Sequence, residues 1–359
     1  MNHEGRLERA RTGLEAASLD GLLVTNLTNV RYLTGFSGSA GQVLVTGTGA
    51  TFFSDGRYRA RAAELVQGAE VAIYDERLTD LLPKALEQGA VARLGVESTT
   101  MTLDEKEQLA AKLSVELTPV KGIVEELRRV KEPEEIAAVR EAVRISDQAF
   151  EEITGKLRVG ATEREIALDL ELIMRRAGAE NVSFEPIVGT GPLSAHIHHS
   201  PSDRAIAAGD LVLMDFGAIH EGYCSDLTRT VVMGPAAAQL KEVYDLVLSA
   251  QSAGTQAVAP GVSGADADAA ARQVIAEAGK EELFGHGLGH GVGLDIHEAP
   301  RLHKISEDTL QTGEIVTVEP GVYEIGTGGV RIEDCVLVTQ DGAEVLSKAP
   351  KHELIEVPI

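Results

Sequence analysis

The chain has 359 residues, with 33 Lys and Arg against 56 Asp and Glu, and a formal net charge of −23. So acidic a protein is not expected to bind nucleic acid or an anionic membrane surface, because phosphate binding needs concentrated Lys and Arg. Its length exceeds that of one ordinary domain and predicts two. The two cysteines, Cys224 and Cys335, cannot build a disulfide framework and favour a reducing, cytoplasmic location, and neither a signal peptide nor a membrane helix is recognisable.

The first third of the chain alternates strand-like and helix-like patterns of apolar residues. Strands are expected at residues 21–25, 42–46, 51–54, 71–74 and 94–96, and helices at 7–17, 58–66, 78–88 and 103–113. Residues 26–29 are expected to form a turn, and residues 47–49 (GTG) a hairpin turn. The alternation indicates an α/β domain.

A charged stretch around residues 118–133 places the domain boundary at residue 125. Pro133 is expected to begin a long helix, since proline suits a first helical turn. Further on, helices are expected at 134–154, 162–177, 236–259 and 263–278, and strands at 182–188, 211–216, 223–232, 315–319 and 330–339. This second part therefore contains both helices and strands, in a region of its own.

Two aspartates lie in predicted strands. Asp215 lies near the end of an apolar strand, and Asp226 follows eleven residues later, across a segment rich in Gly and polar residues. A hairpin there would aim both carboxylates at one point. Taken alone the pair carries little weight, because a buried Asp bonded to a turn would give the same pattern.

Residues 284–300 read FGHGLGHGVGLDIHEAP and place His286, His290 and His297 in a glycine-rich frame. Glycine leaves room for a ligand or a metal near the backbone. One histidine is more often structural, but three so close together favour a site. The spacing is not HExxH, so the helix of a zincin is not indicated.

Two further acids lie in β-branched segments. Glu319 ends the strand of VTVEPGVY, and Glu333 is expected inside the strand of GGVRIEDCV. A buried carboxylate needs a partner, and a salt bridge with Arg331 would supply one for Glu333. Because residues two apart on a strand face the same side, Arg331 and Glu333 are also expected to line one site.

Together, Asp215, Asp226, His290, Glu319 and Glu333 combine four carboxylates with one imidazole. Such donors suit Mn²⁺, Co²⁺ or Fe²⁺, and zinc less exclusively. Four acids in one pocket repel one another without cations. Two divalent ions would neutralise them and could bridge a hydroxide for attack on a carbonyl.

At this point the sequence resembles a known family. The segments LVLMDFGA, GYCSDLTRT, GHGLGHGVGLDIHEAP, VEPGVY and GGVRIED look like the motifs of the pita-bread dinuclear metallopeptidases, with most similarity to Xaa-Pro aminopeptidase and Xaa-Pro dipeptidase (prolidase). The segments RYLTGFSGSAG, FFSDGRY and RRVKEPEEI resemble that family's N-terminal domain and linker. The resemblance implies an α/β creatinase-type domain over residues 1–125 and an α+β pita-bread metallopeptidase domain over residues 126–359.

The resemblance also implies the roles of single residues. It assigns the five residues above to two divalent ions, Mn²⁺ being expected and Co²⁺ or Zn²⁺ possible, with Asp226 and Glu333 bridging. His198 matches a catalytic histidine that orients the scissile amide, and His199 is the fallback for this position. Residues 196–197 read His-Ile where the family pattern has Leu-Pro. Thr228 is a candidate to orient the ligands.

Outside the ligands, His286 and His297 match two histidines that contact substrate. Arg331 matches an arginine that links the metal site to the substrate pocket, and Tyr323 a tyrosine near a metal carboxylate. Glu319 is expected to act as general base as well as ligand, and His297 to stabilise the oxyanion.

The implied activity is release of the N-terminal residue from peptides with proline in second position. The alternative is a prolidase, which acts only on dipeptides and sets a cation opposite the proline carboxylate. A non-catalytic binding module on this fold is disfavoured because all five ligands are present, and a methionine aminopeptidase would leave the N-terminal domain unexplained. The resemblance further implies a homodimer or higher homo-oligomer.

Overall fold

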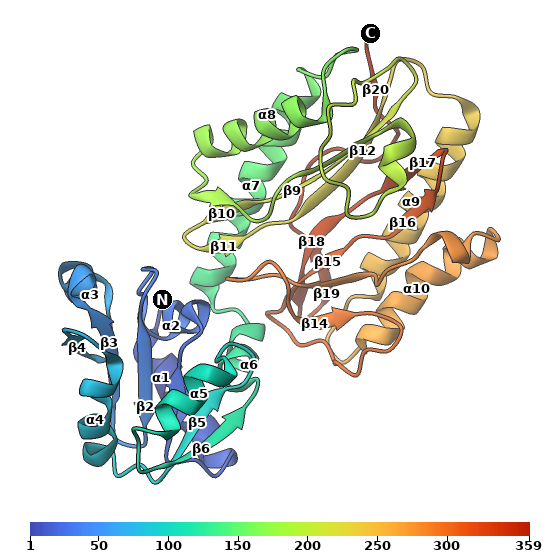
Figure 1. The fold of residues 1–359 in the computed structure, drawn as a ribbon. Helices are drawn as coiled ribbons and strands as arrows, with labels where there is room; N and C mark the ends of the chain where they lie inside the picture. The colour runs from blue at the N-terminus through green and yellow to red at the C-terminus, as the bar shows by residue number, and fades with distance from the viewer. The chain divides into compact units, whose positions relative to one another are not determined.

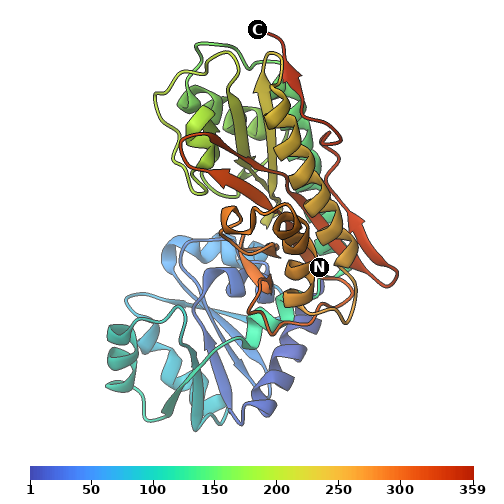
Figure 2. The ribbon, with the colours of Figure 1, turned by 90° about the vertical axis from the view of Figure 1, so that its right-hand side faces the viewer.

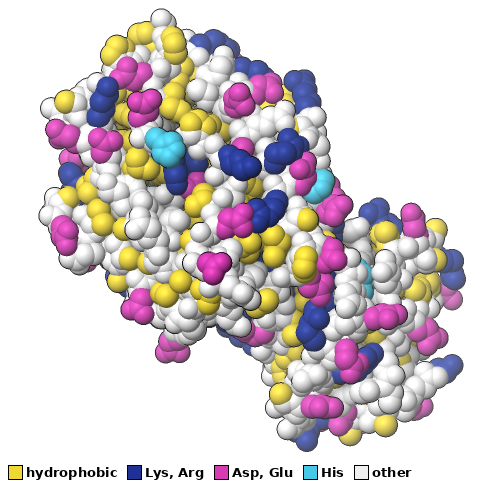
Figure 3. All heavy atoms as spheres, turned by 180° about the vertical axis from the view of Figure 1, so that it is seen from behind, with side chains coloured by type: hydrophobic (Ala, Val, Ile, Leu, Met, Phe, Trp, Pro, Cys, Tyr) yellow, Lys and Arg dark blue, Asp and Glu magenta, His cyan; other side chains and the backbone are white.

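The computed structural model describes residues 1–359, which form two compact units: an N-terminal unit, Met1–Arg128, and a C-terminal unit, Arg129–Ile359 (Figure 1). None of the helices combines the length and the apolar character needed to cross a membrane. On the face shown in Figure 3, Asp and Glu side chains are interspersed with Lys and Arg rather than gathered in one patch. The acidic excess is therefore spread out on this face.

The N-terminal unit is built on one six-stranded mixed sheet. Its elements are α1 (His3–Ala16), β1 (Gly21–Val24), α2 (Leu27–Thr34), β2 (Gln42–Thr46), β3 (Ala50–Asp55), η1 (Gly56–Tyr58), α3 (Arg59–Leu65), β4 (Glu70–Tyr74), η2 (Leu78–Asp80), α4 (Leu82–Gln88), β5 (Arg93–Glu97), α5 (Leu103–Ala110), β6 (Glu116–Val120) and α6 (Ile123–Arg129). The strand order is β4-β3-β2-β1-β5-β6. Leu23, Leu44 and Leu94 of the sheet pack with Leu82 and Leu86 of α4 in a buried core. The expected α/β class is confirmed.

One helix of this unit was predicted as a turn. Residues 26–29 begin α2, and the Asn26 side chain accepts hydrogen bonds from the backbone N–H groups of Thr28 and Asn29. Asparagine favours turns and helix N-caps for the same reason, since its side chain bonds nearby backbone donors. Composition alone therefore does not separate the two.

The C-terminal unit contains two pairs of long helices and two main sheets. Its elements are α7 (Pro133–Thr154), α8 (Glu163–Arg176), β7 (Asn181–Val182), β8 (Ile187–Thr190), η3 (Gly191–Ala195), β9 (Leu211–Phe216), β10 (Ala218–His220), β11 (Tyr223–Cys224), β12 (Leu227–Met233), α9 (Ala238–Ala257), α10 (Gly264–Glu277), η4 (Glu281–Leu283), β13 (Gly289–Gly291), β14 (Glu298–Leu302), β15 (Ile315–Val318), β16 (Gly321–Glu324), β17 (Gly328–Arg331), β18 (Asp334–Thr339), β19 (Gly342–Val345) and β20 (Glu356–Val357). The sheets have the orders β20-β12-β9-β8 and β14-β13-β15-β18-β19.

Each helix pair covers its own sheet. Apolar residues of α7 and α8, such as Phe150 and Leu170, share a buried core with Met214 of β9. Residues of α9 and α10, such as Val247, share a second core with Val316 of β15. Figure 1 shows the strands between the two helix pairs, and Figure 2 shows the gold helix α9 running lengthwise beside the red strands. The unit thus repeats one helices-on-sheet arrangement.

The two sheets meet where two predicted strands are interrupted. The backbone N–H of Glu333 donates to the carbonyl of Thr228 at 3.1 Å, which joins the sheets directly. Glu333 was predicted inside a strand; it lies instead between β17 and β18, and Asp226 likewise lies between β11 and β12. Residues 183–186, also predicted as strand, lie between β7 and β8. Because apolar residues flank these breaks on both sides, the periodicity of the sequence predicts one continuous strand at each.

Candidate metal centre

The five side chains singled out as ligands come from strands or strand ends of the two sheets. Asp215 lies in β9 and His290 in β13, whereas Asp226 immediately precedes β12, Glu319 immediately follows β15, and Glu333 immediately precedes β18. Because the sheets meet at Thr228 and Glu333, these positions bring the side chains to the junction of the two halves.

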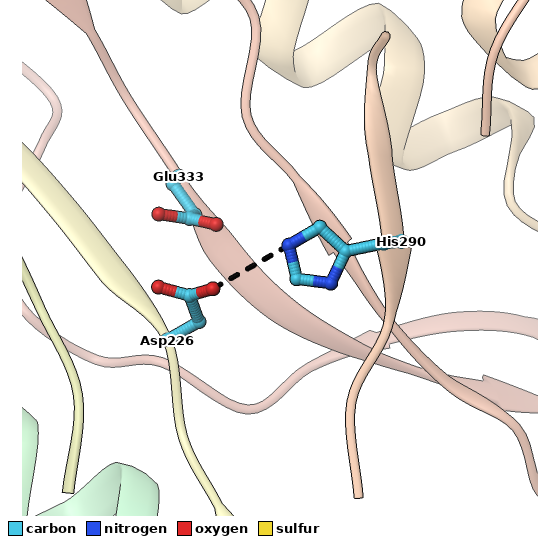
Figure 4. Close-up of side chains that lie close together, drawn as sticks. All are labelled: Asp226, His290 and Glu333. Carbon is cyan, nitrogen blue, oxygen red and sulfur yellow. Dashed lines mark ion pairs between the residues drawn. The ribbon is translucent and has the colours of Figure 1, made fainter. Parts of the chain in front are cut away.

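Asp226, His290 and Glu333 point toward one another in Figure 4, and one ligand atom from each lies within 4.8 Å of the others. The Nε2 atom of His290 lies 3.5 Å from Oδ2 of Asp226 and 3.5 Å from Oε1 of Glu319. The structure therefore brings four of the five predicted ligands to one place, and Asp215 is linked to them through Arg331, as described below.

The ring of His290 is fixed in one tautomer. Its Nδ1 lies 3.0 Å from the carbonyl oxygen of Gly291, and a carbonyl can only accept, so Nδ1 carries the proton. Burial lowers the pKa of His290 to about 4, so the ring is neutral near pH 7 and its lone pair is on Nε2. A histidine that donates one N–H to the backbone and turns the other nitrogen toward acids is arranged as a metal ligand.

Three of the carboxylates have an oxygen with no partner. Oδ1 of Asp215, Oδ1 of Asp226 and Oε1 of Glu333 are buried and accept no hydrogen bond. An unpaired buried acceptor is costly, and here several acceptors face one another together with the lone pair of His290. Divalent cations would satisfy all of them, so the donor set fits oxygen-preferring metal ions with one nitrogen ligand.

The acids also raise one another's pKa values. Burial, followed by Glu333, Asp215 and Glu319, raises the pKa of Asp226 well above its usual value. Burial, followed by Glu319 and Asp215, does the same to the pKa of Glu333. The pKa of Glu319 rises to about 8, chiefly by burial. Without cations these groups cannot all be ionised near neutral pH, as the sequence predicted.

Gly289 and Gly291, on either side of His290, were expected to leave room for a metal or a ligand, but they leave room for neighbouring strands instead. A Cβ on Gly289 would lie 2.0 Å from the carbonyl oxygen of Thr317, and one on Gly291 would lie 2.2 Å from that of Ala299. The missing side chains therefore make room for the neighbouring strands β15 and β14, not for a metal. Glycine on both sides lets β13 fit between them and hold the imidazole in place.

Arg331 is the centre of a buried hydrogen-bond network. It is 2% exposed, and its Nη2 donates to Oδ2 of Asp215 at 2.6 Å. Its Nε donates at 3.0 Å to Oγ1 of Thr228, which in turn donates to Oε2 of Glu333 at 2.7 Å. The ion pair of Arg331 is thus with Asp215 and not with Glu333. Thr228 therefore bonds the carboxylate of Glu333, a candidate ligand, and both Arg331 and Glu333 line one site.

The same network continues to His286. Nη1 of Arg331 donates to the hydroxyl of Tyr323, which lies 2.9 Å from Nε2 of His286. Because Nδ1 of His286 lies 2.7 Å from the carbonyl of Gly287, Nδ1 carries the proton and Nε2 accepts from Tyr323. Burial, then the charge of Arg331, lowers the pKa of His286 to about 3. This ring is neutral, and both its nitrogens are engaged.

His297 and His198 are less constrained. The ring centroid of His297 lies 4.4 Å from that of His290, and neither nitrogen of His297 makes a hydrogen bond. Burial lowers the pKa of His297. The charge of Asp215 opposes this shift, and His198 and Arg301 add to it. His198 also lowers the pKa of His286. His198, His286 and His297 therefore lie close enough to interact beside the metal ligands.

The two adjacent histidines of the 196–199 segment differ in their contacts. His198 is exposed and makes no hydrogen bond, whereas Nε2 of His199 lies 2.7 Å from Oε2 of the buried Glu163. His199 is already engaged on the side of α8, and His198 is free to contact a substrate. This geometry favours His198 over the fallback.

Arg301 was not singled out by the motifs. Residue 301 pairs with His290 in the β13–β14 ladder, and its exposed side chain makes no hydrogen bond or ion pair. Its charge lowers the pKa values of both His290 and His297. It is therefore a free cation beside the candidate metal centre. Arg301 could have been identified only from the register of β13 against β14, which the sequence patterns do not reveal.

Comparison with known proteins adds two family matches. Residues 137–340 match the model of metallopeptidase family M24, and residues 6–130 match that of the creatinase/prolidase N-terminal domain. Each match lies mainly in one of the two compact units.

Individual relatives match over nearly their whole length. An Xaa-Pro dipeptidase of Pyrococcus horikoshii is 37% identical over 344 residues, covering 95% of this chain and 96% of the relative. The solved structure of an Xaa-Pro dipeptidase from Bacillus anthracis superposes with a TM-score of 0.97 and 42% identity, over 99% of this chain and 100% of that one. The X-Pro aminopeptidase from Thermotoga maritima superposes with a TM-score of 0.89 and 33% identity, over 97% and 100%.

Proposed function

Because the chain belongs to metallopeptidase family M24 and carries a creatinase/prolidase N-terminal domain, we propose that this metal-dependent hydrolase is an Xaa-Pro dipeptidase that uses two divalent metal ions, expected to be Mn²⁺. The observation that carries the proposal is the convergence of unpaired carboxylate oxygens on a histidine whose free nitrogen faces them. A non-catalytic module would have no need to keep so costly a cluster.

The substrate length is the point at which the sequence motifs and the relatives differ. The motifs favoured an aminopeptidase, with the dipeptidase as alternative. The dipeptidase now has the better support, because relatives named as dipeptidases match this chain with higher identity than the named aminopeptidase. Proline-containing dipeptides are therefore the proposed substrates.

In the proposed mechanism, Asp215, Asp226, His290, Glu319 and Glu333 would hold the divalent ions, which would supply an activated water and polarise the scissile carbonyl. Glu319 takes the proton of that water and passes a proton to the leaving proline nitrogen. His297, whose ring nitrogens are free, donates to the developing oxyanion, and His198 orients the scissile amide. Each of these roles requires a side chain that faces the ligand cluster.

Other residues hold this arrangement together. Arg331 keeps Asp215 in place and joins it through Tyr323 to His286. Because both nitrogens of His286 are engaged and its pKa is lowered to about 3, we assign it contact with the substrate through its ring rather than proton transfer. It should therefore contribute no ionisation to the pH–rate profile.

Turnover of Gly-Pro compared with the tripeptide Ala-Pro-Ala tests the substrate length. After loading with Mn²⁺, we expect hydrolysis of Gly-Pro and little or no hydrolysis of Ala-Pro-Ala. Equal or faster cleavage of the tripeptide would replace the dipeptidase by the aminopeptidase. Failure to cleave either peptide would contradict Xaa-Pro hydrolysis altogether.

Arg301 is proposed to bind the carboxylate of the dipeptide's proline, since it is an unpaired cation beside His297. Loss of a charged hydrogen bond costs about 1.5–3 kcal/mol, so Arg301→Ala should raise the KM for Gly-Pro by roughly ten- to a hundredfold. Arg301→Lys, which keeps the charge, is the matched control. Gly-Pro-amide lacks the carboxylate and should be hydrolysed equally poorly by wild type and Arg301→Ala; an unchanged KM for Gly-Pro would remove Arg301 from the site.

A cytoplasmic location and a homodimer complete the proposal. The location is supported by Cys224 and Cys335, which are both free and buried, as expected in a reducing compartment. The dimer follows from the family resemblance alone. Light scattering of the purified protein measures its mass directly.

A further inference from the structure

The loop that carries His198 has little regular structure of its own. After η3 ends at Ala195, the chain forms no helix or strand until β9 begins at Leu211. Such a loop keeps one conformation only if side chains and neighbouring elements fix it. His198 is exposed and bonds to nothing, so it cannot fix the loop itself.

A buried carboxylate supplies the missing contacts. Glu163, the first residue of α8, is 0% exposed. Its Oε1 accepts from the backbone N–H and the hydroxyl of Thr190 at 2.8 and 2.7 Å. Its Oε2 accepts from Nε2 of His199 at 2.7 Å, and from the N–H and hydroxyl of Ser202 at 3.0 and 2.6 Å. The five bonds tie residues on both sides of His198 to one carboxylate.

The backbone of α8 also bonds this loop, and here α8 supplies the donors and the loop the acceptors. The N–H of Glu163 donates to the carbonyl of Arg204, and the N–H of Arg164 donates to that of Ser202, each at 3.1 Å. These are first-turn N–H groups, which have no partner within a helix. Nη1 of Arg204 adds a bond to Oγ1 of Thr190 at 2.6 Å. The loop is thereby fastened to the start of α8 at several points.

The hydrogen bonds keep the carboxylate charged. Burial would raise the pKa of Glu163, but the bonds from Ser202, His199 and Thr190 lower it below its usual value. A charged carboxylate only accepts hydrogen bonds, and all five of its partners are donors. No capacity is left for a substrate or a metal, so the group has a purely local purpose.

We infer that Glu163 is a positioning residue that holds His198 beside His286 and His297. The inference rests on the proposed function, because it gives His198 its task. Residues 199 and 202 are bonded to Glu163 on one side of His198 and Thr190 on the other. With these anchors in place, the backbone at His198 has little freedom to move away from the site.

The variant Glu163→Gln tests this role. Glutamine keeps the size of the side chain but puts an NH₂ donor where an acceptor is needed, opposite an N–H of either Thr190 or Ser202. A displacement of a catalytic group by about 1 Å can cost on the order of a hundredfold in rate, so kcat for Gly-Pro should fall by roughly ten- to a hundredfold. The KM and the Mn²⁺ content should stay close to those of wild type. Glu151→Gln, which changes an exposed glutamate of α7 that makes no hydrogen bond or ion pair, is the matched control and should retain full kcat.

A double-mutant cycle separates positioning from general damage. In a His198→Ala background, Glu163→Gln should reduce kcat by less than about twofold, because the group it positions is gone. An equal loss with and without His198 would overturn the inference, as would full activity of Glu163→Gln. If Glu163→Gln does not fold, Ser202→Ala serves instead, because it removes one of the five hydrogen bonds to Glu163. It should reduce kcat by less than Glu163→Gln would, and the reduction should again depend on the presence of His198. Full activity of Ser202→Ala, or a loss of kcat that simply adds to that of His198→Ala, would overturn the positioning role of Glu163. A wild-type enzyme inactive on Xaa-Pro peptides would instead overturn the proposed function and this role with it.

Discussion

Replacing Glu333 by glutamine is expected to abolish metal-dependent hydrolysis and to stabilise the metal-free protein at the same time. Glu333 is 1% exposed, and its Oε1 has no partner. Burial and the neighbouring acids raise its pKa, so as an anion it destabilises the metal-free fold. Glutamine is neutral and can still accept the hydrogen bond of Thr228. With metal present, however, it replaces a carboxylate ligand, and kcat should fall by at least about a thousandfold.

The stability difference should depend on pH. Because the pKa of Glu333 in the folded chain lies above its ordinary value, the metal-free wild type loses stability as the pH rises from the ordinary value through the raised one. Glu333→Gln does not titrate, so its advantage should widen with pH, each kcal/mol raising Tm by about 2–4 °C. Added Mn²⁺ should stabilise the wild type and not the variant.

Thermal unfolding of both proteins across a pH series, without and with Mn²⁺, measures these effects together. Glu324→Gln, which changes an exposed acid of β16, controls for the loss of one negative charge. A metal-free Glu333→Gln protein less stable than wild type would contradict the repulsion between the acids. Unchanged metal content would remove Glu333 from the ligands.

Removal of the Arg331 guanidinium is expected to have the largest effect on stability. Its three nitrogens bond to Asp215, Thr228 and Tyr323 in the interior. Breaking a buried ion pair by removing one partner costs about 3–5 kcal/mol, because the other charge is left uncompensated. Arg331→Met should therefore lower the free energy of unfolding of the metal-free protein by that amount, and should also lower turnover, since Tyr323 and His286 lose their support.

Arg331→Lys separates charge from geometry. Lysine retains the positive charge near Asp215 but cannot serve three acceptors with a planar fork. It should recover part of the stability and little of the kcat. Urea unfolding and Gly-Pro kinetics of the two variants give both quantities. Equal stability of wild type and Arg331→Met would show that the ion pair with Asp215 does not stabilise the fold.

The regular elements were predictable where one pattern dominated. The long helices α7, α8, α9 and α10 and strands such as β9 and β15 were expected close to their observed bounds, because apolar spacing at one period continues through each. The predicted strand pairing that joins Asp215 to the segment after Asp226 is also present, as the antiparallel β9–β12 ladder.

What could not be predicted depends on contacts between distant segments. Strands β13 and β14 contain glycine, proline and charged residues instead of an alternating pattern, and they are held by close backbone approaches at Gly289 and Gly291. The place of Arg301 follows from that ladder. The bond of Glu163 to Ser202 joins residues 39 apart in the chain, through a loop with no periodicity. Residue types therefore indicated the candidate ligands, whereas the groups that hold these side chains and the histidines in place could be found only from the fold.

The most direct test of the account is the rate of Gly-Pro hydrolysis as Mn²⁺ is returned to chelator-treated protein, with bound metal measured in the same samples. We predict no hydrolysis without metal, full activity at saturation, and two bound ions per chain. Hydrolysis that persists in the metal-free protein, or metal that binds at the acids without any Gly-Pro turnover, would contradict a metal-dependent Xaa-Pro dipeptidase.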